Sequence, residues 1–231
     1  MELMTRSLFA RHPQDSGLRF SLQIFDNASQ DDMTDLESFA ESEGIPITQS
    51  GFTTETRHNS HGEVLRRFVL ENPEATHYLF LDSDVCFLED LTLNSMLVEL
   101  ENTPNAFGIG ARMSWDGIEE IPEDNWKANP DIYHARLHPC CALVKNTPVF
   151  RNVVEEIGLS YVKYLWAETE EYLDTFKLMT KVMKTHGLKH ILSSKMVLHF
   201  FCVSYYWEPT QHWNEVKAER RDQLLEQYRN Y

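Results

Sequence analysis

Two aspartates, Asp82 and Asp84, follow an apolar run in residues 77–88, HYLFLDSDVCFL, and form the only Asp-x-Asp of the chain. Two carboxylates beside a hydrophobic strand repel one another and lose hydration, so a divalent cation or a cationic partner is expected between them. Ligand sets built from oxygen favour Mg²⁺, Mn²⁺ or Ca²⁺. A solvated turn is the simpler interpretation of the spacing, but the place after a strand favours a metal or phosphate role.

The run before these aspartates, residues 78–81, is apolar at every position. This pattern predicts a strand that is buried on both faces, as in a parallel sheet. Sheets of that kind keep their binding sites at the carboxyl ends of the strands, which is where Asp82 and Asp84 stand.

Composition limits the class of protein. The 231 residues suffice for one domain with a full core, and no linker divides them. The formal net charge of −15 disfavours nucleic acid and anionic lipid as general partners. No apolar run reaches the ~20 residues that span a bilayer, and the first residues lack the apolar core of a signal peptide, so a soluble, cytoplasmic protein is predicted. The cysteines lack zinc or redox spacing and are predicted to be buried free thiols: Cys86, Cys140, Cys141 and Cys202.

Periodicity predicts alternating strands and helices. The expected strands are residues 18–25, 45–48, 78–81, 106–113, 137–144 and 191–203. The expected helices are residues 32–43, a helix from about 61, and residues 93–101, 148–158, 168–186 and 213–228, with a long loop at 114–136. This order predicts an α/β fold: a Rossmann-like domain whose central sheet is mainly parallel and flanked by helices.

Four segments together resemble a nucleotide-sugar glycosyltransferase of the GT-A fold, similar to family 2. They are IFDNAS (24–29), RHNSHGE (57–63), YLFLDSDV (78–85) and VLHF (197–200), and the resemblance extends over about residues 18–201. It implies transfer of a sugar from a UDP- or GDP-sugar to a saccharide or other hydroxyl acceptor, with inversion and with Mn²⁺ or Mg²⁺. It also implies a single domain over 1–231, with a nucleotide-binding part at about 18–113, an acceptor part at about 114–203 and a C-terminal helix at about 213–228.

The resemblance assigns a metal site. It implies that Asp84 is the direct metal ligand, that Asp82 lies beside it at the ribose and diphosphate, and that His199 completes the site. An ion held by so few protein ligands keeps positions for two phosphate oxygens and stabilises the departing diphosphate. From the residues alone, His199 is equally explained as a packed histidine between strands.

The resemblance also suggests residues that bind the nucleotide. Asp26 and Asn27 match an acidic turn that contacts the nucleobase, although an Asx turn or helix cap explains them as well. Arg57 is a candidate for base or phosphate contact, because guanidinium pairs bidentately with phosphate. His61 and Gly62 open a helix whose N-terminal amides can face an anion, and helix capping is the alternative.

An inverting transfer needs a base for the acceptor hydroxyl. The resemblance places an acidic residue at the start of a late helix, where the chain offers Glu168, Glu170, Glu171 and Asp174. Asp174 is favoured and Glu171 is second, while a solvated acidic first turn of a helix is the alternative.

The resemblance also places acceptor-binding residues in the loop at 114–136. Trp115 and Asp116 are the candidates, because an indole face stacks on a sugar and a carboxylate binds hydroxyls. Trp126, Tyr133 and His138 are weaker, since loop aromatics also seal loops onto cores.

One departure from the family pattern leaves alternatives open. Residues 1–17 look like the helix and loop that follow the family's first strand, so that strand is missing from the pattern, and unpaired backbone is expected in its place. A degenerate GT-A-like module that binds without turnover is therefore an alternative. A haloacid-dehalogenase-like phosphatase, with Asp82 and Asp84 as nucleophile and acid and Lys145 as its cation, is another. A nucleotidyltransferase would need a Gly-rich N-terminal loop with Arg and Lys, which this sequence does not have.

Overall fold

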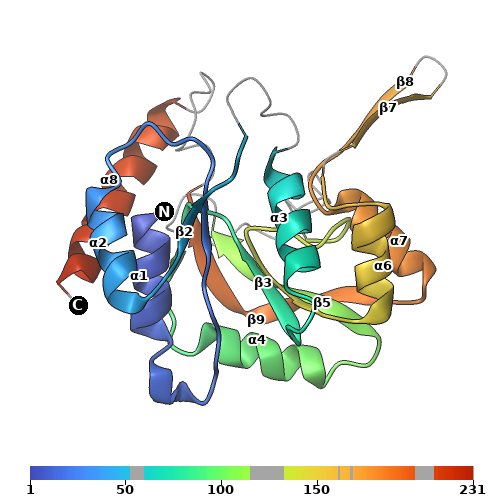
Figure 1. The fold of residues 1–231 in the computed structure, drawn as a ribbon, viewed down its shortest axis with the longest axis horizontal. Helices are drawn as coiled ribbons and strands as arrows, with labels where there is room; N and C mark the ends of the chain where they lie inside the picture. The colour runs from blue at the N-terminus through green and yellow to red at the C-terminus, as the bar shows by residue number, and fades with distance from the viewer. Residues whose placement is uncertain (53–59, 115–132, 161, 167–168, 201–210, 231) are drawn as a thin grey trace.

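A computed structural model describes residues 1–52, 60–114, 133–160, 162–166, 169–200 and 211–230 (Figure 1). The helices in this part of the chain are α1 (Glu2–Arg11), α2 (Thr34–Glu43), α3 (Ser60–Glu71), α4 (Thr92–Glu101), α6 (Pro148–Glu156), α7 (Lys177–Thr185) and α8 (Gln211–Arg229), with a 3₁₀ turn at Gln14–Ser16. The strands are β1 (Ile24–Asp26), β2 (Ile47–Gln49), β3 (His77–Leu81), β4 (Val85–Phe87), β5 (Ala106–Ser114), β6 (Cys141–Lys145), β7 (Val162–Trp166), β8 (Thr169–Leu173) and β9 (Lys189–His199). The predicted α/β class is confirmed.

The central sheet has five strands in the order β3-β6-β5-β9-β4. Strands β5 and β9 pair in parallel, whereas β6 and β4 run antiparallel to their neighbours, so β3, β5 and β9 share one direction. Strands β1 and β2 form a separate parallel pair, and β7 and β8 form a hairpin that projects from the body (Figure 1). The main sheet is therefore mixed, and the β1–β2 pair lies outside it.

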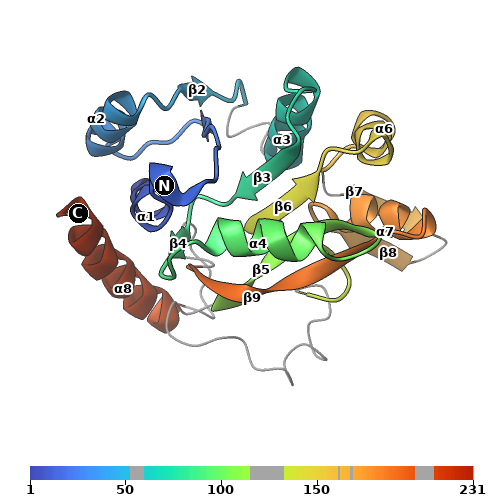
Figure 2. The same cartoon turned by 90° about the horizontal axis from the view of Figure 1, so that it is seen from below.

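Two apolar layers cover the main sheet. Tyr78 and Phe80 of β3 are buried on the face covered by α3, α6 and α7, with Phe107, Phe150 and Phe176. The opposite face packs on α4 and α1 through a second core that contains Leu8, Phe87, Met96, Leu100, Ile109 and Met113 (Figure 2). Burial on both faces explains why the strands read as continuous apolar runs.

Several helix ends follow their sequence signals. Thr147 caps α6, because its hydroxyl accepts from the Phe150 N–H at 3.2 Å, and Pro148 takes the first helical position. Gly44 ends α2 with φ of 67°, a left-handed conformation that favours glycine. These local signals are sufficient because they act within a few residues.

The prediction of one helix over 168–186 is wrong in its first part. Residues 169–173 form β8, which pairs with β7, and α7 begins only at Lys177. Leu173 and Phe176, both buried, have helical spacing, but Phe176 stands at φ 68° and interrupts the backbone. The predicted strand at 18–25 is also shorter, since only residues 24–26 form β1.

Three cysteines, Cys86, Cys140 and Cys141, are buried and free, as predicted, while Cys202 lies outside the described residues.

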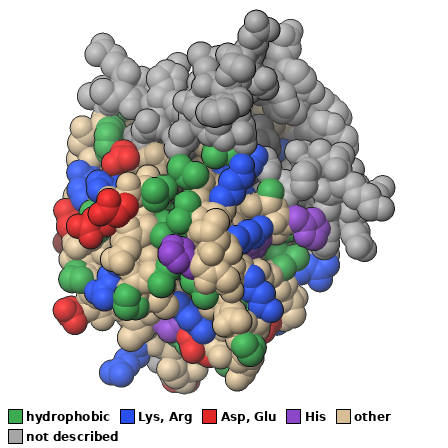
Figure 3. Space-filling model, turned by 90° about the vertical axis from the view of Figure 1, so that its right-hand side faces the viewer, with side chains coloured by type: hydrophobic (Ala, Val, Ile, Leu, Met, Phe, Trp, Pro, Cys, Tyr) green, Lys and Arg blue, Asp and Glu red, His purple; other side chains and the backbone are tan. Residues whose placement is uncertain are grey.

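Figure 3 shows Lys and Arg side chains spread over the face where α7 lies, in a chain of net charge −15. In the part of the chain that the structure describes, no helix has both the length and the apolar character needed to cross a membrane.

Candidate metal and nucleotide site

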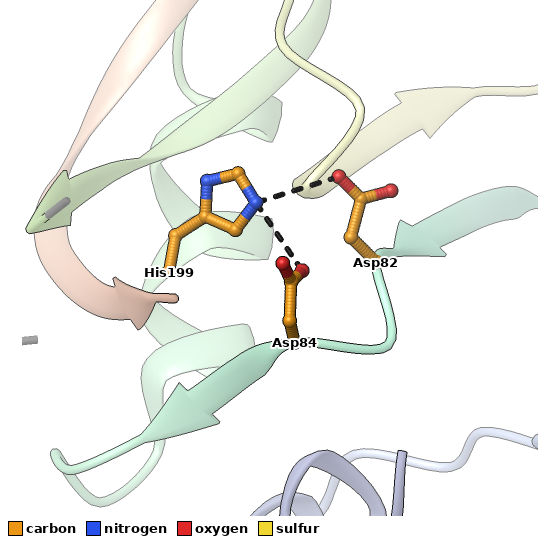
Figure 4. Close-up of side chains that lie close together, drawn as sticks. All are labelled: Asp82, Asp84 and His199. Atoms are coloured by element: carbon orange, nitrogen blue, oxygen red, sulfur yellow. Dashed lines mark ion pairs between the residues drawn. The ribbon is translucent and has the colours of Figure 1, made fainter. Parts of the chain in front are cut away.

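Asp82, Asp84 and His199 form one cluster at an end of the main sheet (Figure 4). His199 Nε2 lies 3.3 Å from Asp84 Oδ1 and 3.8 Å from Asp82 Oδ2, and the potential ligand atoms are all within 4.8 Å of one another. Ligands held at about 2.1 Å from one ion lie roughly 3 to 4 Å apart. Two carboxylates and an imidazole at these distances therefore fit a divalent cation with coordination positions left for a substrate.

Backbone pairing brings these distant residues together. The register of β4 on β9 places Val85 opposite His199, and the Phe200 N–H donates to the Asp84 carbonyl at 2.9 Å. On the other side, the Asp82 N–H donates to the Cys140 carbonyl at 2.9 Å, which extends the pairing of β3 with β6. The segment that carries both aspartates is thus fixed at each end by main-chain hydrogen bonds.

The cluster has an uneven charge distribution. Burial raises the pKa of Asp82 above its usual range, and repulsion from Asp84 adds to this. Burial also acts to raise the pKa of Asp84, but the hydrogen bond and charge of His199 outweigh it and lower that pKa. Burial acts to lower the pKa of His199, yet Asp84 raises it overall. The negative charge of Asp84 thus favours the protonated form of His199, and a bound divalent ion would replace the proton on its ligating nitrogen, because that nitrogen must be neutral.

Two further histidines stand near the cluster. His61 Nε2 lies 3.4 Å from Asp82 Oδ1, at the start of α3, and its side chain is half exposed. The ring of His138 lies 5.7 Å from that of His199, and its Nδ1 accepts from the Cys140 N–H at 3.2 Å. Burial, together with the positive charges of Arg136, His199 and His61, lowers the pKa of His138 well below its usual value. His138 is therefore a neutral hydrogen-bonding group at this wall.

The cluster opens into a cavity of about 940 Å³. The polar end of the cavity is lined by Asn27, His61, Asp82, Asp84, Arg136, His138, Asp174 and His199. The other end is lined mainly by apolar residues of β3, α3, α4 and the segment before β1. This volume is within the range of sites that enclose small molecules and cofactors.

Arg136 was not predicted, although it faces a predicted residue across the site. Its guanidinium is buried and lies 2.7 Å from Asp174 Oδ2, while Nη1 donates to the Thr175 carbonyl at 2.6 Å. The Asp174 side chain remains 43% exposed, so one face of this carboxylate is open to the cavity. An arginine in an irregular segment gives no sequence signal that separates it from a solvated one.

The turn after β1 is held by its own hydrogen bonds. Asp26 is buried, and its carboxylate accepts from the Ser29 N–H at 3.0 Å and from Gln49 Nε2 at 2.8 Å. Asn27 lines the cavity, and its Oδ1 accepts from the Ser50 hydroxyl at 2.6 Å. The geometry therefore supports the structural interpretation of Asp26 and leaves Asn27 as the residue of this pair that lines the cavity.

Gly62 is buried against the backbone of Ser160, and a Cβ at this position would collide with it. The Ser160 hydroxyl also donates to Glu63 Oε1 at 2.8 Å. Close packing of α3 on the segment after α6 thus gives one reason for glycine here that involves no ligand.

The remaining predicted residues are placed as follows. Tyr133 is buried, and its hydroxyl bonds to both the N–H and the carbonyl of Met113, so it holds a loop end onto β5. Glu170 and Glu171 lie in β8, opposite Leu165 and Tyr164. The predictions for Arg57, Trp115, Asp116, Trp126 and Glu168 lie outside the described residues.

The position of Lys145 contradicts the phosphatase alternative, which needs this lysine beside Asp82 and Asp84. Lys145 pairs with His77, at the opposite end of β3 from Asp82, and its ammonium lies 3.6 Å from Glu101. Five residues of strand separate the two ends by roughly 16 Å. Lys145 therefore does not reach Asp82.

Comparison of the fold with solved structures gives consistent matches. One is glucosyl-3-phosphoglycerate synthase from Mycobacterium tuberculosis in complex with Mn²⁺ and UDP-glucose, with a TM-score of 0.52 and 14% identity over 94% of this chain and 71% of that chain. Another is the same enzyme with Mn²⁺, UDP-glucose and phosphoglyceric acid, with a TM-score of 0.53 and 14% identity over 98% of this chain and 75% of that chain. No protein-family model and no curated protein sequence matches the chain.

At this identity the comparison establishes the fold. The chain has the GT-A-like architecture of these synthases, as the sequence predicted.

Proposed function

We propose that the protein is a metal-dependent glycosyltransferase that moves a sugar, a hexose in the first instance, from a nucleoside diphosphate to an acceptor hydroxyl. The observation that carries the proposal is the Asp82–Asp84–His199 cluster at the mouth of a cavity large enough for a nucleotide sugar. The shared fold of synthases crystallised with Mn²⁺ and UDP-glucose supports it.

In this proposal Asp84 and His199 hold Mn²⁺ or Mg²⁺, with Asp82 as a further ligand or a partner of the ribose. When bound, such an ion neutralises the charge that develops on the departing diphosphate. The protein contributes orientation, because main-chain bonds fix both ends of the segment 82–84. His61 lies on the solvent side of Asp82 and can donate a hydrogen bond to a phosphate oxygen.

Asp174 is the proposed base, with Glu171 as the second candidate. It lines the cavity that Asp84 also lines, and Arg136 fixes its carboxylate from behind. Asp174 Oδ1 also accepts from the Thr175 N–H at 2.7 Å, and since the side chain is 43% exposed, this carboxylate can also accept the proton of an acceptor hydroxyl as the sugar carbon is attacked from the face opposite the diphosphate, which gives inversion.

The proposed division of the domain follows the cavity. Residues 18–113 bind the donor, with Asn27 and Arg57 as proposed contacts of the UDP or GDP base. Residues 114–203 bind the acceptor, with Trp115 and Asp116 as proposed contacts. The C-terminal helix, at about 213–228 in this division, lies outside the cavity lining.

The test is differential scanning fluorimetry with UDP, GDP, UDP-glucose and GDP-mannose, each with Mn²⁺, with Mg²⁺ and with EDTA. One nucleotide is expected to raise Tm by about 3 °C or more only with metal, because a ligand of the native state stabilises it by mass action. Release of that nucleoside diphosphate from its sugar is then measured for the wild type and Asp174→Asn. The carboxylate variant is expected to retain binding and to lose about 10²-fold or more of turnover.

Two results would oppose the proposal. Metal-independent shifts, or none with any nucleotide in a folded sample, contradict the metal-nucleotide site. Metal-dependent binding without sugar transfer or hydrolysis under any acceptor condition favours the non-catalytic module.

A further inference from the structure

His12 is a buried histidine directly after α1, outside the candidate metal and nucleotide site. It is 3% exposed, and both of its ring nitrogens have backbone partners. Nδ1 lies 2.7 Å from the Leu8 carbonyl oxygen, which can only accept, and Nε2 lies 3.0 Å from the Leu93 N–H, which can only donate. This pair of contacts fits only the neutral ring, with its one proton on Nδ1 and a lone pair on Nε2.

The contact joins α1 to the start of α4. The Leu93 N–H belongs to the first turn of α4, where amides have no partner within the helix, so His12 caps α4 from another helix. The Leu91 N–H, just before α4, donates to the Arg11 carbonyl at 2.9 Å. Leu91 stands at φ 57°, a left-handed conformation that is costly for leucine. The end of α1 therefore holds a strained connection in place.

Helix α1 also supports β4, the strand that directly follows Asp84. The Ser7 hydroxyl accepts from the Phe87 N–H at 3.1 Å. The rings of His12 and Phe87 pack edge to face, with their centroids 5.1 Å apart. Residues of both α1 and α4 line the cavity (Figure 2). The position of α1 therefore affects the segment with Asp84 and one wall of the cavity.

The surroundings of His12 favour the neutral ring. The charged and titratable side chains closest to the contact along the chain are Arg11, Asp15, Cys86, Glu89 and Asp90, and α8 adds Tyr228. Burial lowers the pKa of His12, although the Leu8 carbonyl and the charge of Asp90 act to raise it. Asp90 is 71% exposed, and its Oδ1 accepts from Arg11 Nη1 at 2.9 Å. Among the described residues, no carboxylate lies within hydrogen-bond reach of His12.

We propose that His12 is a pH-sensitive lock between α1 and α4, which opens when Nε2 takes up a proton. The new N–H would face the Leu93 N–H, so two donors would meet with no acceptor between them. Helix α4 then loses its cap, the turn at Leu91 relaxes, and α1 loosens from β4. Acid thereby weakens the support of Asp84 and of one cavity wall without a change at any proposed metal ligand.

The lock makes stability depend on pH in one direction. The ordinary pKa of histidine, 6.5, applies to the unfolded chain, and the folded value is lower. Below about pH 6.5 the unfolded state therefore binds more protons than the folded state does. The stabilisation is complete above this pH and is lost as the pH falls from 6.5 towards the folded value.

The test compares urea denaturation of the wild type and His12→Gln at pH 7.5 and 5.5. Glutamine offers a donor for the Leu8 carbonyl and an acceptor for the Leu93 N–H but does not titrate. Between the two pH values, the unfolding equilibrium constant is expected to rise about three- to tenfold more in the wild type than in His12→Gln. His186→Gln removes an exposed histidine after α7, and this matched control is expected to follow the wild type.

Hydrogen exchange of the wild type locates the effect without a variant. After correction for the intrinsic pH dependence of exchange, peptides over residues 2–12 and 91–96 are expected to lose protection at pH 5.5, whereas peptides of β5 keep it. Equal pH dependence of stability in the wild type and His12→Gln would overturn the proposal. So would protection of α1 and α4 that persists at pH 5.5, or a loss of protection spread evenly over the sheet.

Discussion

The main sheet and the β1–β2 pair differ in how much packing and strand pairing supports them. The main sheet has two apolar layers, and its strands β4 and β9 fix the Asp84–His199 contact by register. The β1–β2 pair has three paired residues per strand and a small core of its own around Ile24, Leu36 and Ala40. The part of the site that would hold a metal therefore lies on the extensively packed main sheet. The part near Asn27 lies on the β1–β2 pair, which has fewer packing contacts. This difference predicts that metal binding survives damage to β1–β2 better than nucleotide binding does.

The largest expected effect is on folding. Ile109 is fully buried in β5, between β6 and β9, so Ile109→Ala leaves a cavity that cannot collapse and is expected to cost about 4 kcal/mol. Ile24→Ala in β1 removes the same atoms from the smaller core and is expected to cost about 2 kcal/mol. Urea denaturation of both variants measures the difference. Equal losses would show that the two regions unfold as one equally packed unit.

The next effect separates binding from folding. Asp84→Asn keeps the size of the side chain but removes a charged ligand, and metal-dependent nucleotide affinity is expected to fall by about 10²-fold or more. Asp31→Asn makes the same chemical change at an exposed position outside the cavity lining, and this matched control is expected to bind normally. Titration calorimetry with Mn²⁺ measures both variants. Unchanged affinity in Asp84→Asn would remove this aspartate from the site.

A smaller effect concerns the ion pair across the cavity. Arg136→Gln leaves Asp174 without its cation, and because that carboxylate is partly exposed, water offsets part of the loss. A stability loss of about 1 to 2 kcal/mol and a fall in turnover are expected, with nucleotide affinity retained. Arg136→Lys restores the charge and is expected to recover part of both. Loss of affinity in place of turnover would assign Arg136 to donor binding.

The smallest effect concerns the contacts that join α2 to the N- and C-terminal helices. Arg229 pairs with Glu2 of α1 at 2.7 Å and with Asp35 of α2 at 2.6 Å. Burial acts to raise the pKa of Glu2, but hydrogen bonds from Arg229 and Arg6 lower it overall. A lowered folded-state pKa gives stability that is present above the unfolded value, near 4.5, and is lost as the pH falls through the folded value. Glu2→Gln is therefore expected to lose under about 1 kcal/mol at pH 7 and progressively less as the pH falls below 4.5. A difference that grows as the pH falls would reverse this assignment.

The sequence predicted the elements whose signals are local. The apolar run before Asp82, the Thr147-Pro148 start of α6 and Gly44 at the end of α2 each depend on neighbouring residues. The strand directions depend on long-range pairing. Strand β6 runs antiparallel to both β3 and β5, and the order of strands and helices along the sequence does not predict this. The extra strand at 169–173 was missed because its apolar residues continue the period of α7.

The candidate site divides in the same way. Asp82 and Asp84 are neighbours in sequence and could be proposed from spacing, whereas His199 joins them only through the register of β4 on β9, and the resemblance supplied it. Arg136 could not be predicted, because only the fold brings it to Asp174. Among the described residues, β3 is an edge strand of the main sheet, with β6 as its one paired neighbour.

The central claim is that one divalent ion joins His199 to a nucleoside diphosphate, and pulsed electron paramagnetic resonance of bound Mn²⁺ tests it most directly. With UDP or GDP present, the spectrum is expected to show coupling to ¹⁴N from an imidazole and to ³¹P from the diphosphate. His199→Gln is expected to remove the nitrogen coupling. A spectrum with phosphorus but no nitrogen coupling, or nitrogen coupling that persists in His199→Gln, would contradict this metal site.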